Sequence, residues 1–194
     1  VLGKEHLPST PAIILSKHQS AWETLAYQVI FPPQVLVLRK SLLRIPFFGW
    51  GLALMSPIAI PTGSPQTALR QLLKQGEARL RQGFWVVIFP EGTRVPPGET
   101  GNYQAGGALL ATRTGAPVVP IAHNAGELWK RRAFLKYSGT ITVSIGRMIE
   151  PAGLKPAELL ARAASWIESE MQRISDTAKQ EIGDRRSGIG DRTA

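Results

Sequence analysis

The chain contains no cysteine among its 194 residues. A disulfide framework, a thiolate metal site and a cysteine nucleophile are therefore excluded. Histidine is scarce: His6, His18 and His123 lie far apart and outside any HExxH pattern, so the sequence gives no local support for a histidine-built zinc site. The GxSxG turn of serine hydrolases and the phosphate loop of nucleotide hydrolases are also absent, which removes the commonest types of serine hydrolase and nucleotide-hydrolysing enzyme.

Acidic residues are few, since 14 Asp and Glu stand against 23 Lys and Arg, giving a net charge of +9. A balance this basic favours anionic partners, namely nucleic acid, phosphorylated metabolites, an acidic carrier protein or an anionic membrane surface. Hydrophobic residues make up 43% of the chain, which is enough for a folded core. The length corresponds to about one domain.

The sequence also lacks an uninterrupted hydrophobic run that could span a membrane. Its longest uncharged stretch, residues 45–69, contains four prolines and three glycines and cannot be one continuous helix. We interpret this stretch as a buried or membrane-surface segment. Because the first residue is Val1 rather than Met, we expect that an upstream segment is missing, and no signal peptide is visible in what remains.

Short apolar runs alternate with helical patterns along the chain, which is typical of an α/β layer fold. Strands are predicted over residues 11–16, 35–38, 55–60, 84–89, 117–122 and 140–145, the last half-exposed near a sheet edge. Helices are predicted over residues 19–29, 65–82, 105–114 and 156–174. We expect one domain over residues 1–175, with a mixed, largely parallel sheet flanked by helices, and a disordered tail over residues 176–194.

His18 lies where the first predicted strand gives way to a helix, and ligands bind at such strand ends. Glu23 follows five positions later, and on a continuous helix two such side chains point ~140° apart. The pair can meet only if His18 precedes the helix and its ring folds back over the first turn. Glu23 could then hold one ring nitrogen and leave the other free as a base for a hydroxyl. The alternative is a capping histidine beside a solvated glutamate.

The turn FPEGTR, residues 89–94, directly follows the strongest predicted strand. With one carboxylate and one guanidinium, such a turn can bind a phosphate and a neighbouring hydroxyl, because the planar fork of Arg94 donates two parallel hydrogen bonds. The alternative is an ordinary strand-to-helix turn in which Glu91 is ion-paired.

Two further segments place cations beside large apolar side chains. Residues 39–44 (RKSLLR) precede IPFFGW at 45–50, as a head-group site next to an acyl or membrane contact would require. The alternative is a polar loop that leads into a core segment. The second segment, residues 129–137, interleaves aromatic and basic residues, which suits lipid head groups, a phosphorylated carrier or single-stranded nucleic acid. Its alternative is a solvated face.

Four short blocks follow one another along the chain: His18-x4-Glu23, KSLLRIPFFG at 40–49, FPEGTR at 89–94 and VPIA at 119–122. In this order and spacing they resemble the glycerolipid acyltransferase family, which includes the bacterial 1-acyl-sn-glycerol-3-phosphate acyltransferases of phosphatidic acid synthesis. FPEGTR is a specific string, and four blocks in order are far more specific. The resemblance covers about residues 7–174.

The resemblance implies an enzyme in which His18 is the general base for the acceptor hydroxyl and Glu23 orients its ring. Lys40 and Arg94 would clamp the acceptor phosphate, and Glu91 with Gly92 would shape that pocket. The implied substrate-binding set is Lys40, Arg44, Glu91, Gly92, Thr93, Arg94 and Pro120. The acyl donor would be acyl-carrier protein or acyl-CoA, with no metal and no bound cofactor needed. The implied location is the cytoplasmic face of the inner membrane, peripheral or anchored by the missing N-terminal segment.

Two positions depart from the family pattern. Glu23 stands where the family usually has aspartate, and its extra methylene moves the carboxylate by ~1.5 Å unless the backbone adjusts. Lys17 stands where the family usually has asparagine, directly before His18. A cation there would favour a neutral His18 ring, or would simply neutralise Glu23.

Three other functions stay open at this stage. The acceptor could be another lysolipid, such as a lyso-ornithine lipid, or the His18–Glu23 pair could activate water and hydrolyse the thioester. A nucleic-acid binder is suggested only by charge, and leaves His18 and Glu91 unexplained. We therefore expect a lysophospholipid acceptor, a thioester donor and an anionic membrane surface as partners, and no nucleic acid.

Overall fold

The chain folds around one six-stranded sheet with the strand order β3-β2-β4-β1-β5-β6. The computed structural model describes the backbone of residues 1–190 and the side chains of residues 1–177. The strands are β1 (Ile13–Ser16), β2 (Gln34–Arg39), β3 (Ile58–Ile60), β4 (Trp85–Ile88), β5 (Val118–His123) and β6 (Val143–Ile145). All neighbouring pairs are parallel except β5 and β6, which pair antiparallel. The predicted α/β class and the mixed, largely parallel sheet are confirmed.

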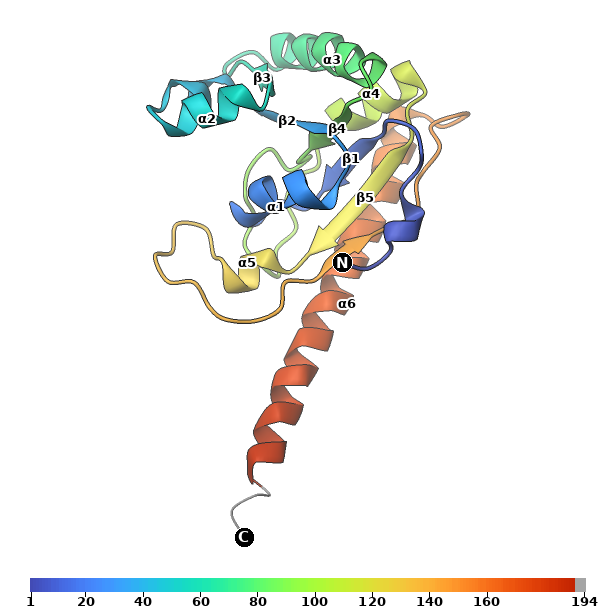
Figure 1. Ribbon diagram of the computed structural model, residues 1–194. Helices are drawn as coiled ribbons and strands as arrows, with labels where there is room; N and C mark the ends of the chain where they lie inside the picture. Colours follow the sequence, from blue (N-terminus) through green and yellow to red (C-terminus); the bar gives the residue numbers. More distant parts are fainter. Residues whose placement is uncertain (191–194) are drawn as a thin grey trace.

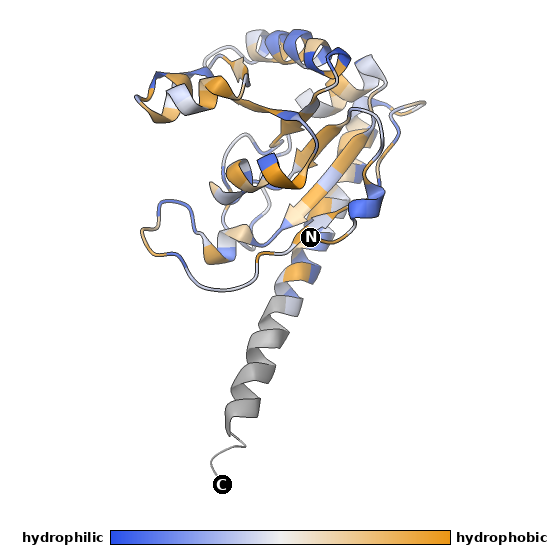
Figure 2. Cartoon of the chain, viewed as in Figure 1, coloured by the Kyte–Doolittle hydropathy of each residue, from blue (hydrophilic) through white to orange (hydrophobic). Residues whose placement is uncertain are grey.

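Helices cover both faces of the sheet (Figure 1). They are α1 (Trp22–Ile30), α2 (Phe48–Leu54), α3 (Pro65–Arg81), α4 (Gly106–Thr114), α5 (Ala125–Leu128) and α6 (Pro156–Gly190), with short 3-10 turns η1 (Lys4–His6) and η2 (Lys40–Arg44). One core lies between the sheet and α3, α4 and α6, and the other lies between the sheet and α1. Figure 2 shows the result, with hydrophobic strands inside and hydrophilic residues on the outer side of α3.

The central strand β1 is buried on both faces because its side chains alternate between the two cores. Ile13 and Leu15 pack in the α3–α4–α6 core, whereas Ile14 packs in the α1 core. In register, Leu15 pairs with Ile88 of β4 on one side and with Pro120 of β5 on the other. The carboxyl ends of these three parallel strands therefore meet at one edge of the sheet, where ligands bind in folds of this kind.

Local signals set most helix ends where the sequence predicts them. Ser64 caps α3 by accepting a hydrogen bond from the backbone N–H of Thr67 at 3.3 Å, and Pro65 occupies the first turn. Gly115 ends α4 in the left-handed conformation, with φ of 74°. The start of α1 differs: the helix begins at Trp22 rather than at residue 19. Residues 17–21 therefore form a loop, which we call the β1–α1 loop.

Three other predictions need correction or completion. The edge strand β6 is fully buried rather than half-exposed, because Leu2 pairs beside Ser144 and the Ser144 hydroxyl donates to Glu170 of α6. β3 is shorter than expected, covering three residues. Helices α2 and α5 were not predicted, since both are short and α2 contains two glycines.

The uncharged segment 45–69 is broken into separate elements, as its prolines and glycines predict. It contributes α2, β3 and the start of α3. No helix within the described part of the chain is long and apolar enough to cross a membrane. At the C-terminal end, α6 continues to Gly190, so the structure has helix over most of the stretch expected to be a disordered tail. Residues 191–194 lie outside the described residues.

Candidate active site

His18 sits in the β1–α1 loop with its ring folded back over the first turn of α1. Glu23 is fully buried, and its Oε1 lies 2.8 Å from His18 Nδ1. The same oxygen accepts the backbone N–H groups of Gln19 at 3.0 Å and Ser20 at 2.8 Å. The predicted meeting of His18 and Glu23 is thus confirmed, and it occurs because the helix starts only at Trp22.

The Glu23 carboxylate fixes which ring nitrogen of His18 carries hydrogen. Burial disfavours its charge, but the opposing interactions, led by the hydrogen bond from His18 and including that from the Ser20 N–H, outweigh burial, so the pKa of Glu23 lies below its usual value. An ionised carboxylate only accepts hydrogen bonds, so Nδ1 donates and the lone pair is on Nε2. Nε2 has no hydrogen-bond partner among the described residues, and the His18 side chain is 19% exposed. The arrangement is that of a general base with one accessible nitrogen.

Phe89 holds the other side of the imidazole. Its ring stacks on His18 with the ring centroids 4.1 Å apart and the planes 19° from parallel. Phe89 is the last residue of the strand predicted over residues 84–89, but it was not predicted as a site residue. The signal was present, because Phe89 directly follows β4 and β4 pairs with β1. Together, Glu23 and Phe89 leave the ring little freedom to rotate.

Glu91 is buried and holds the backbone of the β1–α1 loop. Its Oε2 accepts the His18 backbone N–H at 3.0 Å, and its Oε1 accepts from Lys17 Nζ at 2.8 Å and from the Gly101 N–H at 3.2 Å. A Cβ at position 101 would lie only 2.8 Å from Glu91 Oε1, so glycine is needed there. Glu91 is therefore ion-paired, which was the alternative interpretation of this turn. Its partner, Lys17, belongs to the same site.

Lys17 does not neutralise Glu23, which corrects one of the two expectations for this residue. Side chains alternate along the extended chain: Ser16 reaches Tyr27 of α1, Lys17 points to the opposite face, and His18 returns to the α1 side. On that opposite face Lys17 Nζ lies 2.8 Å from Oε1 of Glu168, a residue of α6. Neither Glu168 nor this pairing was predicted from sequence, because the partner is 151 positions away.

His123, at the end of β5, holds the backbone of the β1–α1 loop. It is fully buried, its Nε2 lies 3.0 Å from the Lys17 carbonyl, and its Nδ1 accepts the Ala125 N–H at 3.2 Å. With Nδ1 accepting, Nε2 carries the hydrogen and donates it to Lys17. Burial lowers the pKa of His123, so the ring is neutral. A buried neutral histidine of this kind positions the backbone and has no exposed nitrogen for substrate.

Three of the predicted cations are free to meet an anion. Lys40 and Arg44 lie at the two ends of η2 and are exposed, and Arg94 is half-buried in the turn after β4. Within the described residues, their side chains make no hydrogen bond or ion pair. Arg131 donates to the Arg94 carbonyl at 3.0 Å and Arg39 donates to the Gly92 carbonyl at 3.2 Å. The turn is thus tied both to the end of β2 and to the segment 129–137.

The remaining predicted site residues are placed as follows. Gly92, with φ of 64°, and Thr93 are exposed in the turn. Pro120 is not brought to His18: it lies within β5 and lines a cavity of about 530 Å³ between the N-terminal segment, β6 and α6. The fourth block is therefore a buried strand beside β1 in this structure, and its proline lines this cavity together with Gly146 and Trp166.

The largely parallel sheet thus carries a histidine–carboxylate pair at the end of its central strand, with the 89–94 turn beside it. A family model described as Acyltransferase matches residues 1–124. The chain belongs to this acyltransferase family.

Among named proteins, the 1-acyl-sn-glycerol-3-phosphate acyltransferase of Pseudomonas aeruginosa is 50% identical over 178 residues, which are 90% of this chain and 69% of that protein. The human 1-acyl-sn-glycerol-3-phosphate acyltransferase beta is 28% identical over 153 residues, 78% of this chain and 55% of that protein. The fold matches the crystal structure of the 1-acyl-sn-glycerophosphate acyltransferase PlsC from Thermotoga maritima, with a TM-score of 0.75 at 20% identity, over 89% of this chain and 70% of that one.

Proposed function

We propose that this chain transfers a fatty acyl group from an acyl thioester to the free hydroxyl of 1-acyl-glycerol-3-phosphate, which gives phosphatidic acid. The single observation that carries the proposal is the His18–Glu23 pair, with Nδ1 held and Nε2 free. The relative that is 50% identical is named for this reaction, which supports the choice of acceptor. Family membership leaves no reason to assign nucleic acid as the partner of the basic surface.

The reaction needs one proton acceptor and no covalent enzyme intermediate. His18 Nε2 takes the proton of the acceptor hydroxyl as its oxygen attacks the thioester carbonyl carbon. The C–O bond forms, the C–S bond breaks, and the proton held at Nε2 passes to the thiolate sulfur. Glu23 stabilises the transient imidazolium, because its Oε1 remains hydrogen-bonded to Nδ1 throughout.

The acceptor phosphate would be bound by the free cations around the turn. Arg94 offers a planar fork that donates two parallel hydrogen bonds to a phosphate, and Lys40 adds a point charge from the start of η2. Arg44 at the end of η2 and Gly92 and Thr93 of the turn complete the proposed binding set. Glu91 contributes by holding the turn and the β1–α1 loop together, since both of its oxygens are already occupied.

The donor would be an acyl-carrier protein or acyl-CoA. Both are acidic, and a net charge of +9 attracts them by long-range steering. No metal ion or bound cofactor has a part in this scheme, because the thioester is already activated and His18 supplies the base.

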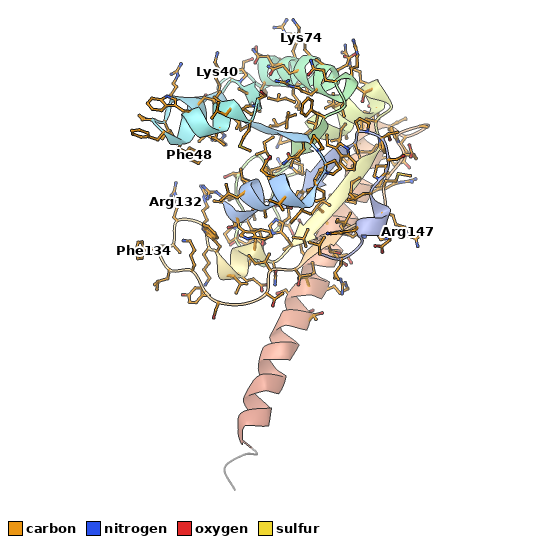
Figure 3. The ribbon with its side chains drawn as sticks, viewed as in Figure 1. Lys40, Phe48, Lys74, Arg132, Phe134 and Arg147 are labelled. Carbon is orange, nitrogen blue, oxygen red and sulfur yellow. The ribbon has the colours of Figure 1, made fainter. Side chains whose placement is uncertain are left out.

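A membrane surface would present the lipid acceptor, and two parts of the molecule suit contact with it. The α2 region exposes Phe47, Phe48, Trp50 and Leu54, with Phe47 80% exposed. The segment 129–137 exposes Phe134, which is 97% exposed, next to its basic residues. In Figure 3, Phe48, Arg132 and Phe134 lie on one side of the molecule, whereas Arg147 lies on the other. We assign this side to an anionic membrane surface, on the cytoplasmic face of the inner membrane.

The proposal is tested with the purified protein, a panel of lysolipids and both donors. We expect acyl transfer to 1-acyl-glycerol-3-phosphate, and weaker transfer to a lyso-ornithine lipid, which lacks the phosphate. His18→Ala should lower kcat by ~10²–10⁴-fold, the usual loss for a positioned base, while His6→Ala should keep full activity. Thioester turnover that does not need any lysolipid acceptor would show a hydrolase instead, and a folded His18→Ala protein with normal turnover would exclude the mechanism.

A further inference from the structure

The ammonium group of Lys17 is buried beside the active site, with its side chain only 1% exposed. A lysine in such a place is stable only if its charge and all three N–H groups are matched. Here Nζ lies 2.8 Å from Glu91 Oε1, 2.8 Å from Glu168 Oε1 and 3.0 Å from the Glu99 carbonyl oxygen. Two carboxylates and one carbonyl therefore satisfy it completely.

Glu168 connects this ammonium group to α6, the C-terminal helix. Its Oε1 also accepts from the Tyr103 hydroxyl at 2.7 Å, and its Oε2 accepts from the Thr100 hydroxyl at 3.0 Å. Burial disfavours the charge on Glu168, but the hydrogen bonds from Lys17, Tyr103 and Thr100 outweigh it, so its pKa lies below the usual value. Glu168 is thus a charged anchor held by three partners.

An unbroken series of contacts runs from α6 to the backbone of His18. Glu168 holds Lys17, Lys17 holds Glu91, and the second oxygen of Glu91 accepts the His18 N–H at 3.0 Å. Glu168 lies outside residues 1–124, the part matched by the family model. The asparagine usual at position 17 in the family carries no charge and could not balance two carboxylates.

We propose that Lys17 and Glu168 are positioning residues for acyl transfer, which fix Glu91 and through it the backbone of His18. The proposal rests on the acyltransferase function proposed above. Neither residue touches substrate; their effect is on where His18 Nε2 points. Geometry at this level matters, since a misplacement of ~1 Å at a reacting group can lower a rate about 100-fold.

The two residues differ in what their removal leaves behind. Without Lys17, the Glu91 carboxylate, whose side chain is fully buried, has no cation next to it. A buried carboxylate without a cation is expected to move, and this weakens its hold on the His18 N–H. Without Glu168, Lys17 keeps Glu91 but loses its link to α6.

The test compares Lys17→Met, Glu168→Ala and the double variant with the wild-type protein. We expect Lys17→Met to lower kcat about 100-fold and Glu168→Ala about tenfold, with KM for donor and acceptor within about twofold of wild type. Because Glu168 acts through Lys17, the double variant should be no slower than Lys17→Met alone, whereas independent effects would multiply. Glu170→Ala is the matched control on α6: this glutamate bonds Ser144 and Arg173 and should leave kcat unchanged.

A second measurement does not depend on activity. Hydrogen exchange of the His18 backbone amide should be faster in Glu168→Ala and in Lys17→Met than in wild type and Glu170→Ala. If Lys17→Met does not fold, the comparison of Glu168→Ala with its control Glu170→Ala still tests the proposal. Unchanged kcat and unchanged His18 exchange in folded Glu168→Ala would overturn the proposal. If the wild-type protein acylates no lysolipid, the proposed function fails, and the exchange rates alone test the positioning.

Discussion

Glu23 carries one methylene more than the aspartate usual at its place in the family, and the local backbone uses the added length. The residue lies in the first turn of α1, where the helix N-terminus favours a negative charge. From there Oε1 reaches His18 Nδ1 and two backbone N–H groups of the β1–α1 loop. The longer side chain therefore fits the loop as it is built here.

We predict that Glu23→Asp lowers kcat by at least about tenfold, with smaller effects on KM. Removing one methylene withdraws the carboxylate by ~1.5 Å and breaks its contact with Nδ1 unless the backbone moves. Steady-state kinetics measures the effect. Glu158→Asp, an exposed carboxylate paired with Arg162 on α6, serves as the control and should have wild-type kinetics. Full activity in Glu23→Asp would mean that the loop adjusts to aspartate at no cost.

A second prediction at the residue scale concerns the cations around the turn. A charge-assisted hydrogen bond to phosphate contributes ~1.5–3 kcal/mol, so Arg94→Ala and Lys40→Ala should each raise the KM of the acceptor at least about tenfold. The KM of the thioester donor should change little. Kinetics with each substrate varied in turn separates the two, and Lys74→Ala, an exposed lysine on α3, is the control. An equal increase in the KM of donor and acceptor would mean that the phosphate site has been assigned to the wrong substrate.

At the level of single elements, α2 and the segment 129–137 both expose large apolar side chains. Phe47, directly before α2, and Trp50 and Leu54 on α2 are all more than half-exposed. The uncharged segment that contains them was expected to be buried or at a membrane surface. These side chains are therefore not buried, and contact with a membrane surface stays a prediction. Exposed apolar groups beside cations are typical of protein surfaces that contact anionic lipid.

We predict that the chain binds anionic vesicles at low salt, and that this binding falls as salt rises and is weak for neutral vesicles. Phe47→Ser with Trp50→Ser should reduce the bound fraction, and so should Phe134→Ser. Met148→Ser is the control, because Met148 is also exposed but follows β6, away from both segments. Co-sedimentation gives the bound fraction. If no protein sediments with anionic vesicles at low salt, the exposed α2 face has another role.

At the scale of the whole molecule, the order β4-β1-β5 collects the site from three distant parts of the sequence. His18 follows β1, the turn with Glu91 follows β4, and His123 ends β5. Parallel pairing puts the carboxyl ends of these strands together, so the hydrogen bonds from His123 to Lys17 and from His18 to Glu91 join neighbouring strand ends. Stability and the site geometry are therefore coupled through the loop.

We predict that the free energy of unfolding decreases as the pH falls below about 6.5. Burial lowers the pKa of His123 from its usual 6.5, so the unfolded chain takes up a proton there at a higher pH than the folded chain does. Glu23 and Glu168, with pKa values lowered from 4.5, stay ionised in both states above pH 5 and lose their contribution only at lower pH. The free energy of unfolding, measured with urea at several pH values between 7.5 and 5, should change less with pH in His123→Gln than in the wild-type protein. An equal slope in both proteins would contradict this cause.

Local sequence patterns were enough to predict the α/β class, most strand positions and the capped start of α3, because hydrophobic period and the positions of Pro and Gly act within one element. They left the meeting of His18 with Glu23 conditional on where the helix begins, and the structure starts that helix at Trp22 instead of residue 19. The sequence also placed Glu91 and Arg94 in the turn that the fold puts next to the β1–α1 loop.

Contacts between residues far apart in the chain depend on how the strands and helices pack together. The sequence could not show that Lys17 faces Glu168 instead of Glu23, that Phe89 stacks on His18, or that Pro120 lines a different cavity. It also mistook β6 for a half-exposed strand, because Leu2 and α6 cover its polar positions. The physical reason is common to all four: strand order and the face of the sheet to which a side chain points are set by long-range packing, which no local pattern encodes.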